Sequence, residues 1–174
     1  YCDLTGEVQW IIDMVSTYES KAKETGARIV HCCGFDSIPS DMGVFHLQQQ
    51  AQSAFGQAAT QVKMRVKSAK GGVSGGRVAS IINLAKEIGE NPSLRQTLSN
   101  HYAICPEGYD PGIRQPEVTT PEFDEDFNAW SAPFVMGSIN TRIVQRSNAL
   151  QNSVYGTPFI YNEAVLTGAG LKGR

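Results

Sequence analysis

Excess positive charge and long hydrophobic runs are both absent from this sequence. Its 15 lysine and arginine residues are matched by 17 aspartate and glutamate residues, which gives a net charge of -2. Nucleic-acid-binding proteins usually carry a basic patch that contacts phosphates, so we expect no nucleic-acid partner. The apolar runs are a few residues long, whereas a helix needs about 20 apolar residues to span a bilayer, so we expect no transmembrane segment.

Cysteine pairs with metal-ligand spacing are also absent. The four cysteines, Cys2, Cys32, Cys33 and Cys105, form no CxxC pair and show no recurring spacing. This pattern argues against a zinc site and against a disulfide framework. We therefore expect no metal ion, and we expect a reducing, cytoplasmic compartment.

The start of the chain lacks an initiating methionine, a basic segment and the apolar stretch of a signal peptide. We therefore expect a fragment of a longer protein. With 174 residues, of which 41% are hydrophobic and 18% charged, the fragment has the composition of an ordinary soluble globular domain.

The first 32 residues predict a helix followed by a buried strand. Apolar residues recur at three- and four-residue steps from Val8 to Ala22, with Thr5 as candidate N-cap and Gly26 as the stop. Residues 27–32 form a short, apolar run that is typical of a buried strand. Such a unit would be half of a βαβ motif, in which functional groups lie beyond the carboxyl ends of the strands.

The segment CCGFDSIPSD, residues 32–41, follows this strand and begins a helix that we expect to reach residue 54. Asp36 or Ser37 can cap the helix, Pro39 suits its first turn, and Asp41 would be favoured there by the helix dipole. A helix cap alone is therefore one interpretation of these polar residues.

Two chemical interpretations compete with the helix cap. Cys33 and His31 could form a nucleophile and its base, although buried free cysteines are usually inert. Alternatively, the carboxylates of Asp3 and Glu7 could converge with those of Asp36 and Asp41 at one edge of a sheet and serve in acid–base chemistry.

The second half of the chain predicts further strands, helices and loops. Residues 61–68 alternate apolar and basic side chains, which predicts a half-buried strand with a solvated basic face. The glycine-rich segment 70–77 could contact a phosphate, but it matches neither GxGxxG nor the P-loop, and tight turns are the alternative. Residues 105–133 predict a long loop, 135–150 a helix, and 155–166 a strand.

Five motifs occur in order along nearly the whole chain: YCDLTGE (1–7), GARIVHCCGFDSIPSDMGV (26–44), GGVSGG (71–76), WSAPFVMGSINTRIVQRSNAL (130–150) and YGTPFIY (155–161). Together they resemble the saccharopine dehydrogenase-like oxidoreductases, in particular the branch that includes the trans-acting enoyl reductases of bacterial lipid synthesis. The resemblance implies an N-terminal Rossmann domain that holds NAD or NADP, followed by an α+β domain with a mixed β-sheet flanked by helices.

The resemblance also implies how the chain divides. Residues 1–30 would be the end of the cofactor-binding domain or a linking helix–strand unit, and residues 31–174 would be the substrate-binding and dimerisation domain. The N-terminal Rossmann domain, with its glycine fingerprint, would be missing, so most of the NAD or NADP site would be missing too. The fragment alone would then be inactive.

The implied function is the substrate-binding portion of an NAD(P)-dependent oxidoreductase, a homodimer that transfers a hydride to an imine or enoyl-type bond of a small, lipid-derived molecule. The alternatives are a non-catalytic interaction or scaffold domain that retains the fold, and a cysteine hydrolase. Asp36 is the first candidate for acid–base work and Asp3 the second. The other residues expected near substrate or cofactor are Thr5, Gly6, Glu7, Cys33, Gly34, Phe35, Ser37, Pro39, Asp41, Gly72, Ser74, Gly75 and Gly76.

Overall fold

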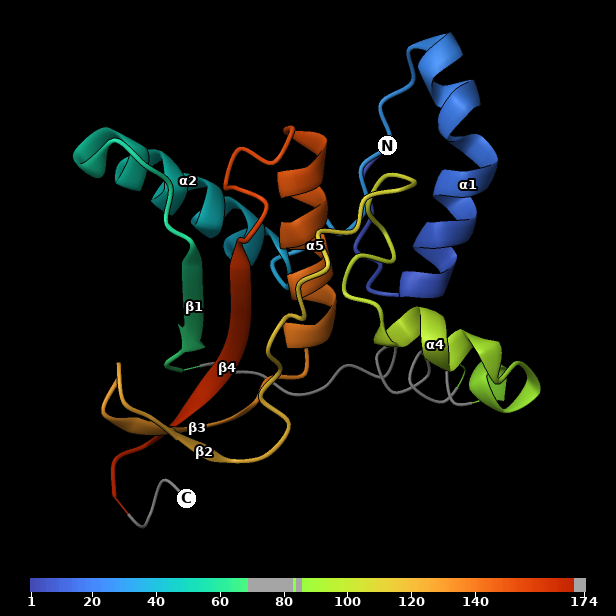
Figure 1. Ribbon diagram of the computed structural model, residues 1–174. Coiled ribbons are helices and arrows are strands. Elements are labelled where there is room, and N and C mark those ends of the chain that lie inside the picture. Colours follow the sequence, from blue (N-terminus) through green and yellow to red (C-terminus); the bar gives the residue numbers. More distant parts are fainter. Residues whose placement is uncertain (69–82, 84–85, 171–174) are drawn as a thin grey trace.

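A mixed sheet lies at the centre of the computed structural model, which describes residues 1–68, 83 and 86–170 (Figure 1). The strand order is β1-β4-β3-β2, and β1 (Gln61–Val66) runs parallel to β4 (Ile160–Gly168). β3 (Ala129–Pro133) pairs antiparallel with β4, and β2 (Glu122–Asp124) pairs antiparallel with β3. Helices flank this sheet, so the predicted α+β class with a mixed sheet is confirmed.

The first core cluster joins the sheet to two helices, α2 (Ile38–Phe55) and α5 (Gly137–Leu150). Its buried members come from α2, β1, α5 and the region around β4: Val44, Val62, Val144, Tyr155, Phe159 and Tyr161. Each fully buried side chain of this kind contributes about 1.5–3 kcal/mol of transfer free energy. α5 approaches β4 closely because Gly137 has no side chain: an added Cβ would lie 3.2 Å from the Glu163 carbonyl oxygen.

The second core cluster joins α1 (Val8–Thr25) to α5 on the side away from the sheet, where α4 (Ser93–Ser99) also lies (Figure 1). Its buried members are Val8, Ile11, Cys32, Ile104 and Ile139. The predicted first helix is confirmed, and it ends at Gly26, whose φ of 71° is the left-handed conformation that glycine adopts readily. Thr5 is not its N-cap, because Glu7 holds that position.

Residues 27–32 do not form the predicted buried strand. Ile29 and Val30 are 46% and 51% exposed, and the only backbone bridge of this run within the described residues is the parallel one between Cys2 and Val30. Val30 pairs with residues 1–3, through backbone hydrogen bonds with Tyr1 and Asp3. This short pairing leaves the side chains of Ile29 and Val30 exposed. The run is apolar, but burial of a strand depends on neighbouring elements, which the composition of the run does not report.

The predicted solvated basic face of residues 61–68 is contradicted at Arg65, whereas Lys67 is exposed and Lys63 is 30% exposed. The Arg65 side chain is 1% exposed and lies 2.7 Å from Asp124 Oδ2 on β2. It also donates to Asn162 Oδ1 at 2.8 Å on the neighbouring strand β4. Lys63 pairs with the same aspartate at 3.4 Å. Arg65 and Lys63 therefore connect β1, at one end of the strand order, to Asp124 on β2 at the other end.

The remaining predictions are confirmed in part. α2 and α5 match the expected helices closely, and the expected loop 105–133 contains the short strands β2 and β3. The predicted last strand begins later, at Ile160, because residues 151–159 form turns. Gly72, Ser74, Gly75 and Gly76 lie outside the described residues. Among the helices that are described, none is long and apolar enough to cross a membrane.

Candidate functional site

Two segments that are distant in the sequence lie side by side before α1 and before α2. The backbone N–H of Cys33 donates to the Asp3 carbonyl at 2.7 Å, and the Cys32 thiol donates to the Thr5 carbonyl at 2.9 Å. Cys32 has a φ of 60°, an uncommon conformation for a residue other than glycine. The structure therefore brings the DLTGE segment of residues 3–7 beside the CGFDSIPSD segment of residues 33–41.

The carboxylate of Asp3 joins these segments through its side chain. Asp3 Oδ2 lies 2.5 Å from His31 Nδ1, and Oδ1 accepts the backbone N–H groups of Thr5 at 3.1 Å and Cys32 at 3.2 Å. Burial acts to raise the pKa of Asp3, but the hydrogen bonds from His31 and the two backbone groups hold this pKa below its usual range. Asp3 is therefore ionised at neutral pH, and because a carboxylate only accepts, His31 Nδ1 carries the proton.

Sequence reasoning paired His31 with Cys33, but the structure pairs it with Asp3. The Cys33 thiol instead contacts the Val30 carbonyl at 3.5 Å. Burial, and then the neighbouring Cys2, raise the pKa of the Cys33 thiol, so the thiolate that a nucleophile requires is disfavoured. The cysteine hydrolase interpretation loses its base and its activated thiol.

The turn of residues 33–37 leads into α2 with few of the predicted capping bonds. Ser37 occupies the N-cap position and is buried, but its side chain makes no capping hydrogen bond. Pro39 lies in the first helical turn as expected, and Phe35 is 90% exposed. Gly34 packs on Leu4, since an added Cβ would lie 3.0 Å from Leu4 Cδ2. Asp36 is half-buried in this turn.

Residues 5–7 of the DLTGE segment are placed by contacts at the start of α1 and near α5. Thr5 Oγ1 accepts the backbone N–H of Glu7 at 3.3 Å, which shapes the entry to α1. Gly6 lies near α5, because an added Cβ would be 3.8 Å from Met136 Cε. Glu7 is half-buried and its carbonyl accepts the N–H of Ile11 at 3.0 Å.

A buried carboxyl group on β4, that of Glu163, supports the turn of residues 33–37 through hydrogen bonds. Glu163 is 5% exposed and accepts hydrogen bonds from Ser40 Oγ at 3.0 Å, Asn140 Nδ2 at 3.1 Å and Tyr161 Oη at 3.0 Å. Asn140 Nδ2 also donates to the Asp36 carbonyl at 2.9 Å. Burial raises the pKa of Glu163, and the three hydrogen bonds oppose that shift. The sequence held no signal for Glu163, because a lone glutamate in a strand usually faces solvent.

A cavity of about 700 Å³ opens between α1, residues 26–31 and α5. Its volume lies within the range of small-molecule sites, about 300–1,000 Å³. Apolar side chains dominate its walls, including Trp10, Ile11, Met14, Val15, Ile29, Val30, Ile104, Ile143 and Leu150. Its polar groups include His31, Asp41, Arg146 and Ser147. The cavity is therefore suited to a ligand with an apolar portion and a polar group.

Asp41 places a carboxyl group against this cavity. Within the described residues, its Oδ1 atom is buried without a hydrogen-bonding partner. Burial raises the pKa of Asp41, and a hydrogen bond with Ser147 opposes the shift. Asp3 and Asp41 thus differ in partners and in the direction of their pKa shifts. Among the residues described, no three His, Cys, Asp or Glu side chains gather closely enough to hold a metal ion.

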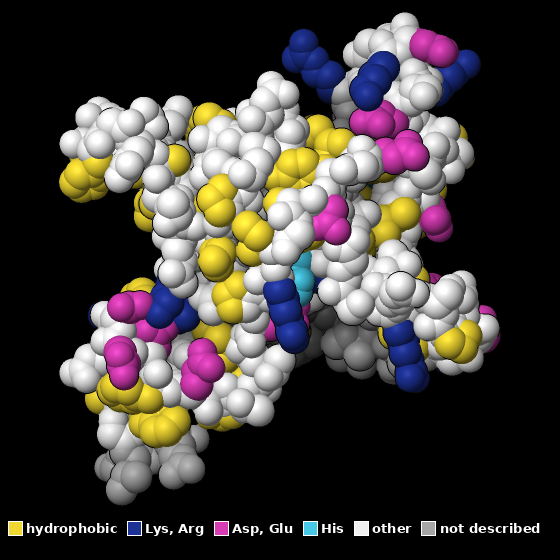
Figure 2. All heavy atoms as spheres, in the orientation of Figure 1, with side chains coloured by type: hydrophobic (Ala, Val, Ile, Leu, Met, Phe, Trp, Pro, Cys, Tyr) yellow, Lys and Arg dark blue, Asp and Glu magenta, His cyan; other side chains and the backbone are white. Residues whose placement is uncertain are grey.

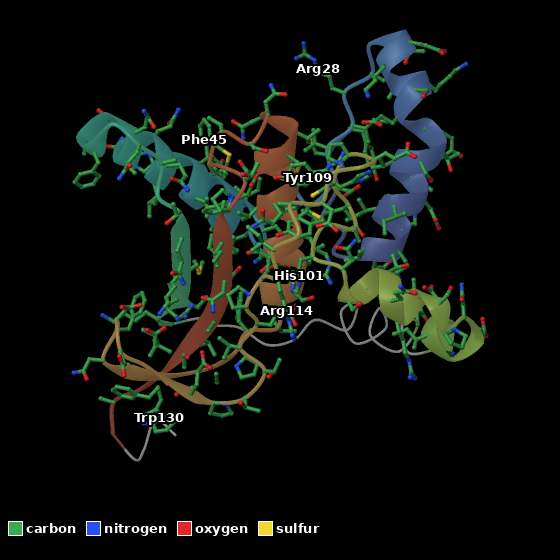
Figure 3. The ribbon with its side chains drawn as sticks, viewed as in Figure 1. Arg28, Phe45, His101, Tyr109, Arg114 and Trp130 are labelled. Atoms are coloured by element: carbon green, nitrogen blue, oxygen red, sulfur yellow. The ribbon has the colours of Figure 1, made fainter. Side chains whose placement is uncertain are left out.

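Two arginines of α5 hold the segment between α4 and β2, which passes across α5 (Figure 3). Arg142 is 2% exposed and donates to the carbonyls of Leu98, Asn100 and Ser138. Arg146 donates to the Ile104 carbonyl and also lines the cavity. Burial lowers the pKa of Arg142. Arg142 is therefore used inside the fold, whereas Arg146 is available to a ligand in the cavity.

The residues of this site fit only one end of a nicotinamide dinucleotide. Leu4 and Phe35, which belong to the two segments that meet at Asp3 and Cys33, are 76% and 90% exposed, and such apolar side chains suit the face of an uncharged ring. Residues 168–173 (GAGLKG) match the GxGxxG spacing, but positions 171–173 lie outside the described residues, so this segment adds no phosphate-binding group to the described site. A dinucleotide would therefore need phosphate-binding groups beyond those described here.

Comparison with known proteins gives similarity over nearly the whole chain. A Mycobacterium tuberculosis protein named "putative trans-acting enoyl reductase" is 39% identical over 175 residues, which are 97% of this chain and 42% of that protein. Proteins named trans-acting enoyl reductase from Mycobacterium ulcerans and Mycobacterium bovis are each 36% identical over 179 residues, covering 42% and 43% of those proteins. No family model and no solved structure matches. The chain is thus similar to trans-acting enoyl reductases, and it spans about two-fifths of the length of these curated relatives.

Proposed function

We propose that this chain is the substrate-binding portion of an NAD(P)-dependent enoyl reductase. The observation that carries the proposal is the 36–39% identity to proteins named trans-acting enoyl reductase over nearly the whole chain. The reaction adds a hydride and a proton across a carbon–carbon double bond that is conjugated to a carbonyl group. The substrate would be a small, lipid-derived enoyl compound, with an imine as the other substrate class.

The cavity between α1 and α5 supports this proposal. Its apolar walls match an acyl chain, since burial of each CH₂ group contributes about 0.8 kcal/mol. His31, Asp41 and Arg146 supply charge and protons at the same cavity, which a reductase needs to polarise a carbonyl and to protonate carbon. Figure 2 shows charged side chains concentrated over the C-terminal end of α1 and near β2, with apolar side chains between α2 and α5.

The cofactor would supply a hydride to the substrate when bound, and this chain's own residues would orient both partners. Leu4 and Phe35 would contact the nicotinamide ring, Asp36 is the first acidic residue proposed for acid–base work, and Asp3 is the second, acting through its hydrogen bond with His31. The other residues proposed to lie near substrate or cofactor are Thr5, Gly6, Glu7, Cys33, Gly34, Ser37, Pro39, Asp41, Gly72, Ser74, Gly75 and Gly76.

The proposed division of the whole protein follows from the length of the relatives. They are more than twice as long as the matched region. We propose that residues 1–30 belong to a cofactor-binding domain and that residues 31–174 bind substrate and form a homodimer in the cytoplasm. Tyr1, Ile29 and Val30 are exposed apolar residues of two short segments that are joined by the bridge between Cys2 and Val30. Further strands could pair with these segments in a larger sheet, which supports this division.

A non-catalytic interaction domain with the same fold is the second candidate. The exposed apolar side chains of Leu4 and Phe35 favour it, because such groups also mark protein contacts. The two candidates differ in one respect: a reductase requires an open cavity, whereas an interaction domain does not.

The test is a reductase assay on the whole protein. Enoyl thioesters of coenzyme A with short and long acyl chains, and separately an imine, are mixed with NADH or NADPH, and loss of reduced nicotinamide absorbance is followed. We expect turnover of a thioester, and Ala22→Leu, which adds bulk to the cavity wall, should raise KM most for the long chains. Ser20→Leu on the exposed face of the same helix is the control. Absence of turnover with every thioester and with the imine would favour the interaction domain.

A further inference from the structure

The Asp3–His31 pair has the geometry of an oriented acid–base group. Asp3 receives a hydrogen bond from His31 Nδ1 at 2.5 Å, and both backbone N–H contacts to its other oxygen fix the carboxylate in place. Both side chains are 13% exposed. A carboxylate on one imidazole nitrogen fixes the tautomer and stabilises the protonated ring.

The second nitrogen of the ring is the one left for a ligand. His31 lines the cavity, and its Nε2 has no hydrogen-bonding partner within the part of the chain that the structure describes. The Trp10 ring, which also lines the cavity, meets the imidazole edge-on, with ring centroids 5.1 Å apart and an interplanar angle of 77°. Asp3 and Trp10 therefore restrict the rotation of the ring and leave one proton-exchanging atom for the cavity.

We propose that His31, held by Asp3, donates the proton to the substrate when the double bond is reduced. This inference rests on the proposed function. The cofactor is the reductant, and its hydride forms the new C–H bond at the β-carbon. The π bond breaks, and its electron pair takes the proton of His31 Nε2–H at the α-carbon. The products are a saturated thioester, an oxidised nicotinamide and a neutral His31, which regains its proton from water.

The alternative proton donors are placed less well. Asp36, the first candidate from the sequence, is not among the residues that line the cavity. Asp3 is ionised and acts through His31, so it is a positioning residue. Asp41 lines the same cavity, but its hydrogen bonding to Ser147 orients it from one side only, and its Oδ1 has no described partner. The titratable groups that share the cavity with His31 are Tyr1, Tyr18, Glu19, Lys23, Asp41 and Arg146. Of these, Glu19 and Lys23 pair with each other at 3.3 Å.

Two substitutions in the whole protein separate the roles of the pair. His31→Asn keeps an N–H near the position of Nδ1 for Asp3 but removes Nε2. We expect kcat to fall about 100-fold or more with little change in KM, as for loss of a general acid. Asp3→Asn keeps the size of the side chain but removes its charge. As the pH is raised, kcat of this variant should begin to fall at a lower pH than kcat of the wild type. A merely structural role for Asp3 would not move the pH profile.

A spectroscopic measurement tests the pair without turnover. In the ¹H NMR spectrum of the whole protein, the Nδ1–H proton between His31 and Asp3 should give a far-downfield signal. The signal should disappear in both variants, while Ser20→Leu should retain it. Thermal unfolding of each variant identifies any loss of folding.

The outcomes separate the two proposals. A folded His31→Asn protein whose kcat stays within about twofold of an active wild type would overturn the role of His31 and leave the reductase standing. An active wild type without the downfield signal would overturn the hydrogen-bonded pair. A wild type that reduces no enoyl thioester or imine would overturn both proposals.

Discussion

Asn140 on α5 donates a hydrogen bond to the backbone carbonyl of Asp36 at 2.9 Å, and the same amide donates to Glu163 on β4 at 3.1 Å. One buried side chain thus connects the turn before α2 to the central sheet. The position of the candidate site depends on this connection, because the turn makes few capping bonds of its own.

Replacement of Asn140 should destabilise the fold. Asn140→Ala leaves the Asp36 carbonyl and one oxygen of Glu163 without this donor. Loss of a buried hydrogen-bonding partner costs about 1–3 kcal/mol, so we expect the free energy of unfolding to fall by that amount. Urea unfolding followed by circular dichroism measures it. Gln49→Ala, on the exposed face of α2, is the control. Equal stability of both variants would contradict the role of Asn140.

Glu163→Gln should reduce the pH dependence of stability. Because burial raises the pKa of Glu163 in the folded state, the unfolded state binds fewer protons between the ordinary pKa, about 4.3, and the raised value. The free energy of unfolding contributed by this group therefore falls as the pH rises through that window. The glutamine variant lacks this titration, so its stability should fall less from about pH 4.5 to 7. Urea midpoints at several pH values check this, and parallel curves for the two proteins would refute it.

Asp124 should contribute stability that is lost in acid. Burial acts to raise its pKa, but the pairing with Arg65 and with Lys63 holds the pKa below its usual range. The folded state therefore releases its proton more readily than the unfolded state, and the contribution is complete above about pH 4 and lost as the pH falls through the folded pKa.

Asp124→Asn tests that contribution. Breaking a buried ion pair costs about 3–5 kcal/mol, and we expect a loss at the lower end at neutral pH, because Lys63 is only partly buried. The difference in unfolding free energy between variant and wild type should shrink as the pH is lowered. Asp13→Asn on the exposed face of α1 serves as the control. A difference that does not change with pH would show that the ion pair is not the cause.

Thiol labelling should distinguish the cysteines by their surroundings. Cys32 is buried and Cys105 is half-buried, and burial raises the pKa of each thiol to about 12. They should react with iodoacetamide at neutral pH only after unfolding. Cys2 is exposed and should label first, with Cys33 slower. Mass spectrometry of peptides at successive times gives the order. If Cys33 reacted faster than Cys2, the cysteine nucleophile would return as a candidate.

The local patterns were sufficient for the helices. α1, α2 and α5 follow apolar spacing and glycine or proline signals that lie within each segment. Residues 27–32 show where this reasoning fails: the run has the composition of a buried strand, yet Val30 is half exposed. Burial of a strand depends on partners in the sheet, and a local pattern does not contain them.

The sequence by itself determined the α+β class, the main helices and the presence of the DLTGE and CGFDSIPSD segments. Only the tertiary structure decided which polar groups meet. His31 pairs with Asp3 across 28 positions, Arg65 reaches Asp124 across 59, and Ser40 binds Glu163 across 123. The physical reason is that helix formation is governed by residues within one or two turns, whereas hydrogen bonds between distant segments form only where the topology brings their backbones together.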